Sequence, residues 1–312
     1  MSSTVMPLEC GWAGVMPAVT TQFDTALEVD LGATRAVQSA LVAEGVHGLV
    51  VLGTVGENNS LTPAEKRSVL EAAVGVAAGR VPVIAGVSEL TTAAAVAFAR
   101  DAGELGASGL MVLPAMVYVP SAAELETHFR SVAAATSLPI MLYNNPPAYR
   151  VAIDLDSLAR LADVPNIVAV KESAPDSRRF TDVLNACGTR FALFAGLDDV
   201  AFEGLVLGAR GWVSGLTNAF PGESLALHAA IRSGDLERAR AIYRWFLPLL
   251  HLDAGHDLVQ AIKLAEQRMG RGSERVRPPR LPLAGARREE VIRLVERAAA
   301  TRPPLGRSGE AP

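Results

Sequence analysis

The feature that most constrains the fold is a regular alternation between residues 14 and 214. Short apolar runs rich in Val, Ile and Leu alternate there with longer segments of helical periodicity. We predict eight strands, at residues 14–20, 48–52, 81–86, 109–113, 139–143, 167–171, 192–196 and 211–214. Eight βα units close into a (β/α)8 or TIM barrel, whereas a doubly wound sheet would carry a Gly-x-Gly-x-x-Gly turn that is missing after the first run. The sequence therefore predicts an α/β TIM barrel.

Local signals support the predicted helices and the domain division. Thr62, Pro63 and Glu65 form a capping-box pattern at the start of one helix, and Gly45 marks the end of another. Beyond residue 220 only helical patterns remain, at residues 223–232, 236–250, 258–269 and 288–300. We predict a catalytic barrel at residues 1–220, a helical C-terminal region packed on it at residues 221–301, and a disordered tail at residues 302–312.

Composition narrows the class of partner. The net charge is -4 and the isoelectric point is near 5.8, which gives no basis for binding nucleic acid or an anionic membrane. No basic segment followed by an apolar core opens the chain, and no run has the roughly 18 apolar residues of a membrane span. Cys10, Cys187 and the five histidines lack the spacing of disulfide or metal sites. We expect a cytoplasmic protein with a small-molecule substrate, no metal and no cofactor.

Lys171 is the strongest catalytic candidate because it ends the apolar run of residues 167–170. TIM barrels place their active sites at the carboxyl ends of the strands. A lysine desolvated at such a position has a lowered pKa, and its free amine attacks carbonyl groups. The alternative is a lysine that extends into solvent or pairs with Glu172.

Two further strand ends offer polar groups. Tyr143 ends its strand, and its phenol is suited to relay protons over a substrate bound to Lys171. The turn of residues 53–56 lets backbone N–H groups approach an anion, and the Thr54 hydroxyl is placed to join a relay with Tyr143. An ordinary strand tyrosine and a simple tight glycine turn are the alternatives.

Other polar residues are weaker candidates. Asp198 and Asp199 read either as paired carboxylates or as a cap of the next helix, and we favour the cap. Arg178 and Arg179 begin a helix and are expected on a solvated face. No Gly-rich loop ends in Gly-Lys-Ser or Gly-Lys-Thr, so nucleotide chemistry is not indicated.

The three strand-end motifs together resemble the dihydrodipicolinate synthase/N-acetylneuraminate lyase family, over about residues 14–303. The motifs that carry the resemblance are Gly-Thr-Val-Gly-Glu at residues 53–57, Tyr-Asn-Asn-Pro at 143–146 and Val-Lys-Glu-Ser at 170–173. The resemblance implies that Lys171 is the Schiff-base nucleophile, Tyr143 the proton relay and Thr54 its partner. It also implies a homo-oligomer, a dimer or a tetramer.

The resemblance further implies a substrate-binding set made of Gly53, Val55, Tyr118 and Val213. The amides near Thr54 and Val55 would hold the substrate carboxylate. Tyr118 resembles the second tyrosine that members of this family lend to a neighbouring subunit.

Two departures bear on the branch of the family. Val55 stands where the family has a second hydroxyl, and no arginine follows the tyrosine motif directly, since the chain reads Pro147-Ala148-Tyr149 before Arg150. Several segments resemble the branch that deaminates 1-pyrroline-4-hydroxy-2-carboxylate in hydroxyproline catabolism, namely residues 149–151, 171–173 with Arg178 and Arg179, 211–215, 241–246 and 259–266. We expect that activity. The alternatives are dihydrodipicolinate synthase or another pyruvate-dependent aldolase or sugar-acid dehydratase, and, in another class, a non-catalytic keto-acid-binding regulator.

Overall fold

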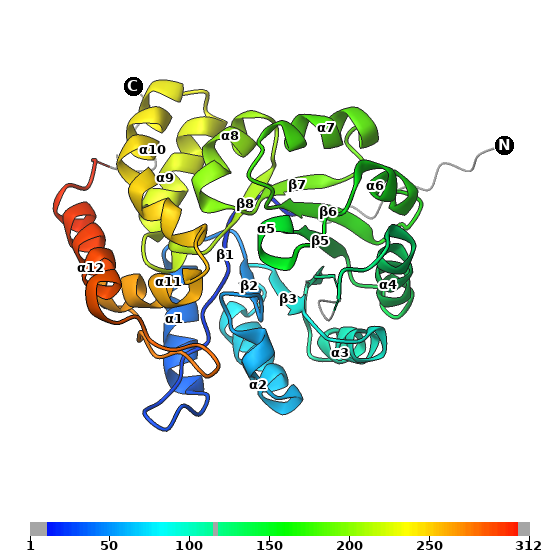
Figure 1. The fold of residues 1–312 in the computed structure, drawn as a ribbon, viewed down its shortest axis with the longest axis horizontal. Coiled ribbons are helices and arrows are strands. Elements are labelled where there is room, and N and C mark those ends of the chain that lie inside the picture. The colour runs from blue at the N-terminus through cyan, green and yellow to red at the C-terminus, as the bar shows by residue number, and fades with distance from the viewer. Residues whose placement is uncertain (1–10, 115–117, 305–312) are drawn as a thin grey trace.

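A computed structural model of the chain describes residues 11–114 and 118–304 and shows a barrel of eight parallel strands (Figure 1). Its strands are β1 (Gly14–Pro17), β2 (Leu49–Val51), β3 (Val83–Val87), β4 (Gly109–Val112), β5 (Ile140–Asn144), β6 (Ile167–Glu172), β7 (Ala192–Ala195) and β8 (Gly211–Ser214). The hydrogen-bonded order is β1-β8-β7-β6-β5-β4-β3-β2, and a parallel bridge between Ala18 and Val50 closes the ring. The predicted TIM barrel is confirmed, with every predicted strand present within a few residues.

Helices follow the strands around the outside of the barrel. They are α1 (Leu31–Ala43), α2 (Pro63–Ala77), α3 (Thr92–Glu104), α4 (Ala122–Ala134), α5 (Pro146–Tyr149), α6 (Leu155–Leu161), α7 (Arg178–Cys187) and α8 (Ala201–Val206). The predicted capping box is present, because Glu65 N donates to Thr62 Oγ1 and Thr62 N donates to Glu65 Oε2. Helix α1 ends as predicted, with Gly45 in the left-handed region at a φ of 90°.

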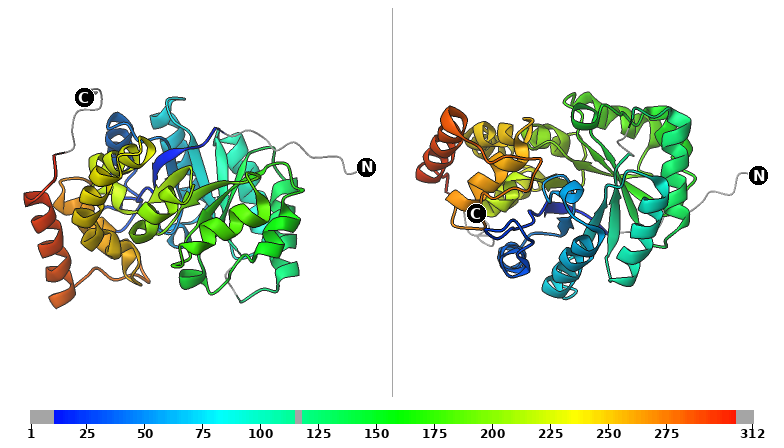
Figure 2. Two further views of the ribbon diagram at one scale, coloured as in Figure 1. Left: turned by 90° about the horizontal axis from the view of Figure 1, so that it is seen from above. Right: turned by 60° about the horizontal axis from the view of Figure 1, so that its bottom comes forward.

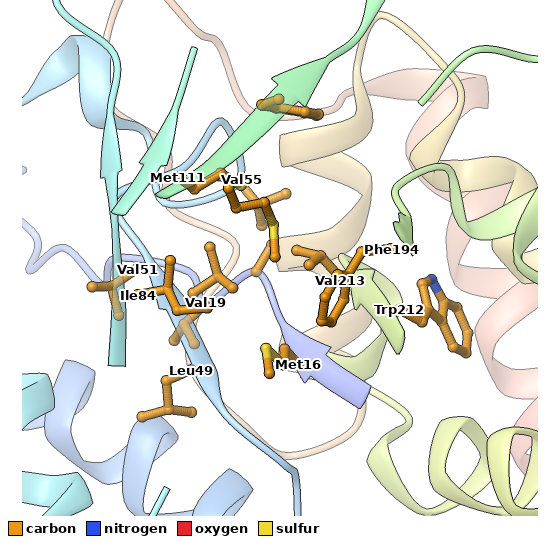
Figure 3. Packing of buried hydrophobic residues seen from close by; sticks show 14 of the residues in the cluster. Met16, Val19, Leu49, Val51, Val55, Ile84, Met111, Phe194, Trp212 and Val213 are labelled. Carbon is orange, nitrogen blue, oxygen red and sulfur yellow. The ribbon is translucent and has the colours of Figure 1, made fainter. Parts of the chain in front are cut away.

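Small and branched apolar side chains fill the barrel. All strand residues are buried, and the cluster includes Met16, Leu49, Val51 and Ile84 (Figure 3). Since only 5% of the residues are aromatic, the buried cluster is made mainly of Val, Leu and Ala. The packed interior leaves the strand ends as the place for a ligand.

The C-terminal region contains α9 (Pro221–Arg232), α10 (Leu236–Leu250), α11 (Leu258–Arg268) and α12 (Gly285–Ala300). Helix α9 follows β8 and contacts β1 and α8, as a barrel helix does. Helix α12 lies at the periphery, on the opposite side of the barrel from α3 and α4 (Figure 2). These helices confirm the predicted C-terminal extension, while the division at residue 220 stays a prediction.

The ends of the chain are only partly described. Arg302, the first residue of the predicted tail, forms an ion pair with Glu223 at 3.0 Å, whereas residues 305–312 and Cys10 lie outside the described residues. Cys187 is a free, half-buried thiol. Within residues 11–114 and 118–304, no helix is long and apolar enough to cross a membrane.

Candidate active site

Lys171 lies buried near the carboxyl end of β6, with Tyr143 of β5 and Phe194 of β7 beside it in register. Its Nζ atom stands over the Tyr143 ring, 3.8 Å from the centroid. Burial lowers the pKa of Lys171, and the negative charges of nearby Asp253 and Asp198 oppose that shift. The environment therefore favours the free amine, as the sequence predicted.

The alternative pairing of Lys171 with Glu172 is not observed. Glu172 instead accepts hydrogen bonds from Asn144 Nδ2 at 2.7 Å and from Arg179 Nε at 3.2 Å. The expectation that Arg179 lies on a solvated face is therefore wrong, because its guanidinium turns inward to this buried carboxylate. Arg178 is exposed, as predicted, and pairs with Asp176.

Gly196, directly after β7, makes room for the lysine side chain. A Cβ atom at this position would lie 2.8 Å from both Cγ and Cε of Lys171 and 2.1 Å from Oγ of Ser173. Real Cβ atoms do not approach other atoms so closely. The glycine therefore permits the observed path of the Lys171 side chain toward the barrel mouth.

A cavity of about 450 Å³, its open mouth included, lies above the strand ends. Six of the seven predicted site residues line it, namely Gly53, Thr54, Val55, Tyr143, Lys171 and Val213. Its walls also include Met111, which lies near Val55 in Figure 3, together with Ala148, Leu197 and Asp253. A mostly apolar lining with a few convergent polar groups, here Thr54, Tyr143 and Lys171, is typical of small-molecule sites.

The seventh predicted residue, Tyr118, lies elsewhere. Its side chain is 56% exposed, and its hydroxyl donates to Glu124 Oε1 at 3.0 Å. It does not line the cavity of its own chain. Its expected loan to a neighbouring subunit stays a prediction.

The loop after β2 has the geometry of an anion site. Leu52 and Glu57, which flank residues 53–56, both adopt the left-handed region, with φ of 60° and 54°. Such backbone strain costs of order 1–3 kcal/mol per residue and is concentrated at functional sites. Among the described residues, no hydrogen-bond acceptor is found for the N–H groups of Thr54 and Val55. Two successive free donors form a concavity suited to a carboxylate.

The C-terminal helices hold this loop in place. Lys263 of α11 donates to Glu57 Oε1 at 2.9 Å and to Thr21 O at 2.8 Å, and neither charged side chain of the pair is exposed. The backbone N–H of Arg277 donates to the second oxygen of Glu57 at 3.0 Å. Sequence reasoning left the role of the C-terminal region open, and the structure shows that it braces the candidate anion site.

Two tyrosines lie close to the lysine. Burial raises the pKa of Tyr143 to about 12, and Asn145 Nδ2 donates to its hydroxyl at 2.9 Å. The Thr54 hydroxyl is hydrogen-bonded to the hydroxyl of Tyr149, not to that of Tyr143 as the sequence suggested. The sequence analysis predicted no separate role for Tyr149. Its position six residues after Tyr143 was the sequence feature that could have indicated one.

Asp198 and Asp253 place two carboxyl groups next to the lysine. Asp198 accepts from Trp212 Nε1 at 2.9 Å and from Leu216 N at 2.7 Å, and burial raises its pKa to about 6. The prediction that Asp198 caps a helix is wrong, because its carboxylate accepts hydrogen bonds from donors in β8 and in the loop after it. Burial, reinforced by Asp198, raises the pKa of Asp253 well above its usual range.

The remaining sequence candidates take no part in the cavity. Asp199 pairs near the surface with His251 Nδ1 at 2.9 Å. In the described part of the chain, no group of three or more His, Cys, Asp or Glu residues is arranged to hold a metal ion.

Comparison with known proteins identifies the family. The model of the dihydrodipicolinate synthetase family matches residues 11–298. The chain belongs to this family. It is 33% identical over 277 residues to 4-hydroxy-tetrahydrodipicolinate synthase 1 of Halalkalibacterium halodurans, covering 89% of this chain and 94% of that protein.

Solved structures agree with this assignment. Dihydrodipicolinate synthase from Aquifex aeolicus superposes with a TM-score of 0.89 at 31% identity, over 92% of this chain and 98% of that one. A prophage protein of the family from E. coli K12, solved in complex with pyruvate, gives a TM-score of 0.87 at 28% identity, over 92% and 99%. The chain is therefore an enzyme of the dihydrodipicolinate synthase family, whose members are Schiff-base lyases. These comparisons support the family and the synthase alternative, and they do not support the pyrroline-carboxylate deaminase branch that the sequence favoured.

Proposed function

We propose that the cavity binds a 2-keto acid, with pyruvate as the first candidate, and that Lys171 forms a Schiff base with its C2 carbon. The observation that carries this proposal is a buried lysine with a lowered pKa at a cavity whose rim offers free N–H groups. An unprotonated amine is the nucleophile that this chemistry needs. The pyruvate complex of the related prophage protein supports the choice of first ligand.

The other residues of the cavity have complementary roles in this proposal. The N–H groups of Thr54 and Val55 bind the substrate carboxylate, and this fixes the carbonyl carbon relative to Lys171. Tyr143, whose raised pKa keeps its phenol protonated at neutral pH, gives a proton to the carbinolamine oxygen, which leaves as water. Gly53 and Val213 shape the walls around the bound acid.

The first candidate reaction is the one named by the relatives, formation of 4-hydroxy-tetrahydrodipicolinate. The Schiff base loses a methyl proton to give an enamine, which adds to the aldehyde carbon of aspartate semialdehyde. The amine of that substrate then closes the ring on C2 and displaces Lys171. The sequence and structural neighbours support this reaction, since those compared are named for the synthase or its family.

The second candidate is deamination of 1-pyrroline-4-hydroxy-2-carboxylate, and the lining of the cavity favours it. No arginine lines the cavity among the described residues, and Arg150 is exposed. Ala148 and Asp253 line the cavity instead. The carboxylate of a second substrate such as aspartate semialdehyde would therefore meet no guanidinium and one acidic group. A cyclic imine with one carboxylate avoids that repulsion.

The chemistry of this second candidate balances without a cofactor. Lys171 attacks C2, the ring nitrogen departs from C2 as an amine on C5, and loss of a C3 proton gives an enamine that expels the 4-hydroxyl as water. Tautomerisation forms an imine at C5. Two waters then hydrolyse the C5 imine and the Lys171 Schiff base, which releases ammonia and 2-oxoglutarate semialdehyde for a net consumption of one water.

The proposal is tested by borohydride trapping followed by mass spectrometry, with pyruvate and the hydroxy-pyrroline carboxylate offered separately and Lys171→Ala as the control. We expect an adduct on the wild type that is absent from the variant. The absence of any adduct would refute the Schiff-base function and leave a non-covalent keto-acid regulator. Turnover assays then separate the two reactions, since only deamination releases ammonia and only the synthase consumes aspartate semialdehyde with pyruvate.

A further inference from the structure

We propose that the carboxyl group of Asp253 binds the 4-hydroxyl group of the substrate and gives it the proton with which it leaves as water. This inference deepens the proposed function and rests on its second candidate reaction, in which Lys171 binds C2 of a hydroxylated cyclic imine. It assigns a substrate class to the site, namely acids that carry an uncharged hydroxyl group two carbons beyond the Schiff base.

Asp253 reaches the cavity from a segment outside the barrel. It ends the short 3-10 helix η4 (His251–Asp253), which lies between α10 and α11 in the chain, and it lines the cavity together with Lys171. Gly215, directly after β8, makes room for its side chain, because a Cβ atom at this position would lie 2.6 Å from Asp253 Oδ1. A glycine at this strand end therefore admits the carboxyl group to the mouth of the barrel.

One of the two carboxyl oxygens of Asp253 has no partner within the protein. Oδ2 accepts from Asp198 N at 3.3 Å, whereas no donor to Oδ1 is found within residues 11–114 and 118–304. Asp253 is only 8% exposed, and buried polar atoms are as a rule hydrogen-bonded. Because the residue lines the cavity, a ligand bound there can supply the missing partner.

The neighbouring Asp198 is in a different situation. Its carboxylate accepts from Trp212 Nε1 at 2.9 Å, from Leu216 N at 2.7 Å and from Ser214 Oγ at 3.2 Å. It does not line the cavity, and Asp253 is the one acidic residue that does in the described part of the chain. Asp198 therefore stabilises the loop after β8, and Asp253 is the carboxyl group available to a ligand.

The position of the Schiff base directs the rest of the substrate toward Asp253. The strands β6, β7 and β8 are neighbours in the barrel, so Lys171, Gly196 and Gly215 follow one another along its rim. Both glycines line the cavity and leave space beside the lysine. With the substrate carboxylate at the loop after β2 and C2 at Lys171, the carbons beyond C2 extend into this space.

Other polar side chains of the cavity wall are already hydrogen-bonded. The Thr54 hydroxyl is bonded to that of Tyr149, and Asn145 Nδ2 donates to the Tyr143 hydroxyl. The Tyr143 phenol serves the oxygen on C2 in the proposed function. A hydroxyl group on C4 is thus left with Asp253 Oδ1 as its partner.

The electrostatics of Asp253 suit a general acid. Burial, followed by the negative charge of Asp198, raises the pKa of Asp253 well above its usual range. The carboxyl group therefore holds its proton at a higher pH than an exposed aspartate does. A general acid is most effective when its pKa lies near the working pH, because it must both hold a proton and give it up.

The step balances without a further reactant. The electron pair of the enamine forms the C3–C4 double bond as the C4–O bond breaks, and the proton of Asp253 passes to the departing oxygen, which leaves as water. Asp253 then regains a proton from solvent. This proton matches the one that C3 released to solvent when the enamine formed.

The test compares two leaving groups at C4, since chloride departs without a proton and hydroxide does not. Wild type and Asp253→Asn receive the 4-hydroxy pyrroline carboxylate or its 4-chloro analogue, at a pH where both proteins trap pyruvate maximally. Because a general acid contributes about 10²–10⁴-fold, we expect ammonia release from the hydroxy compound to fall about 100-fold in Asp253→Asn, and chloride release to stay within about threefold. Lys171→Ala gives the background rate of chloride release.

Asp163→Asn, which removes an exposed carboxylate, is the matched control and should leave both rates unchanged. Equal losses with the two leaving groups would show a structural effect of Asp253→Asn and overturn the inference, as would a wild-type rate of ammonia release. A wild type that traps pyruvate but releases no ammonia would also overturn the inference, while the Schiff-base function would stand. No adduct on the wild type would remove the function and the inference together.

Discussion

The Nζ atom of Lys171 stands 3.8 Å from the centre of the Tyr143 ring, and the two residues are direct partners in the register of β5 and β6. Side chains alternate between the two faces of a strand, so a shift of one residue in either strand would separate the amine from the phenol. The barrel therefore fixes the pair by backbone pairing. The candidate chemistry depends on this register and on the space kept open around it.

Gly196→Ala tests that space. The added Cβ would lie within 3 Å of two Lys171 carbons, so the lysine must leave its observed path. We expect borohydride trapping of pyruvate to slow by at least about tenfold, because a displacement of about 1 Å at a reacting group costs up to 10²-fold. Gly75→Ala in α2, where a Cβ meets nothing within 4 Å, is the matched control and should trap pyruvate normally. Normal trapping by Gly196→Ala would show that the lysine tolerates another path.

Asp253→Asn tests the electrostatics of the amine. The charge of Asp253 opposes the effect of burial on the pKa of Lys171, so its removal should lower that pKa further. The fraction of free amine then rises at a given pH, and the acidic limb of the pH profile for adduct formation should move to lower pH. The shift appears only at a pH where Asp253 is ionised in the wild type, since its own pKa is raised.

The control for this prediction is Asp163→Asn, which removes an exposed carboxylate paired with Arg130. Asp163 lies in the loop before β6, whereas Lys171 lies near the carboxyl end of that strand. Its pH profile should overlay that of the wild type, because exposed charges are screened by solvent and salt. A movement of the limb to higher pH in Asp253→Asn would contradict the expected direction of the pKa shift.

The sequence predicted the strands well because each short apolar run is bounded by turn residues, and the strand-end rule then selected Lys171, Tyr143 and Thr54. The predictions failed for residues whose interaction partners come from segments distant in the chain. Asp253 approaches Lys171 from a segment some eighty residues later in the chain, and no local sequence pattern predicts this contact. The prediction for Asp198 was wrong for the same reason, since a cap is a local signal and its donors belong to β8 and the loop after it.

Lys263→Met tests the brace between α11 and the anion loop. The charged side chains of Lys263 and Glu57 are both fully buried. Removal of one partner would leave the charge of the other buried and unpaired. Loss of one member of such a pair costs about 3–5 kcal/mol of the free energy of unfolding. Denaturant titration should show this loss. Lys263→Met combined with Glu57→Gln should recover part of it, because no unpaired charge remains buried.

The outcome that would contradict this brace is a Lys263→Met variant as stable as the wild type. A second readout follows the function of the loop. Because Glu57 borders residues 53–56, we expect the pyruvate concentration needed for half-maximal trapping to rise in Lys263→Met. Unchanged affinity together with lowered stability would limit the pair to a role in folding.

Glu266→Gln tests a pH-dependent contribution to stability. Burial raises the pKa of Glu266 to about 7 from its usual value of 4.5, although Thr20 and Gln22 donate to its carboxylate. Since the folded-state pKa exceeds the unfolded one, the folded protein binds more protons between these values, and stability from this group is lost as pH rises from about 4.5 to about 7. Relative to Glu266→Gln, the wild type should therefore lose free energy of unfolding across that window. Denaturant titrations of both proteins at a series of pH values measure the difference, and a difference that is constant with pH, or that grows in favour of the wild type as pH rises, would contradict the raised pKa.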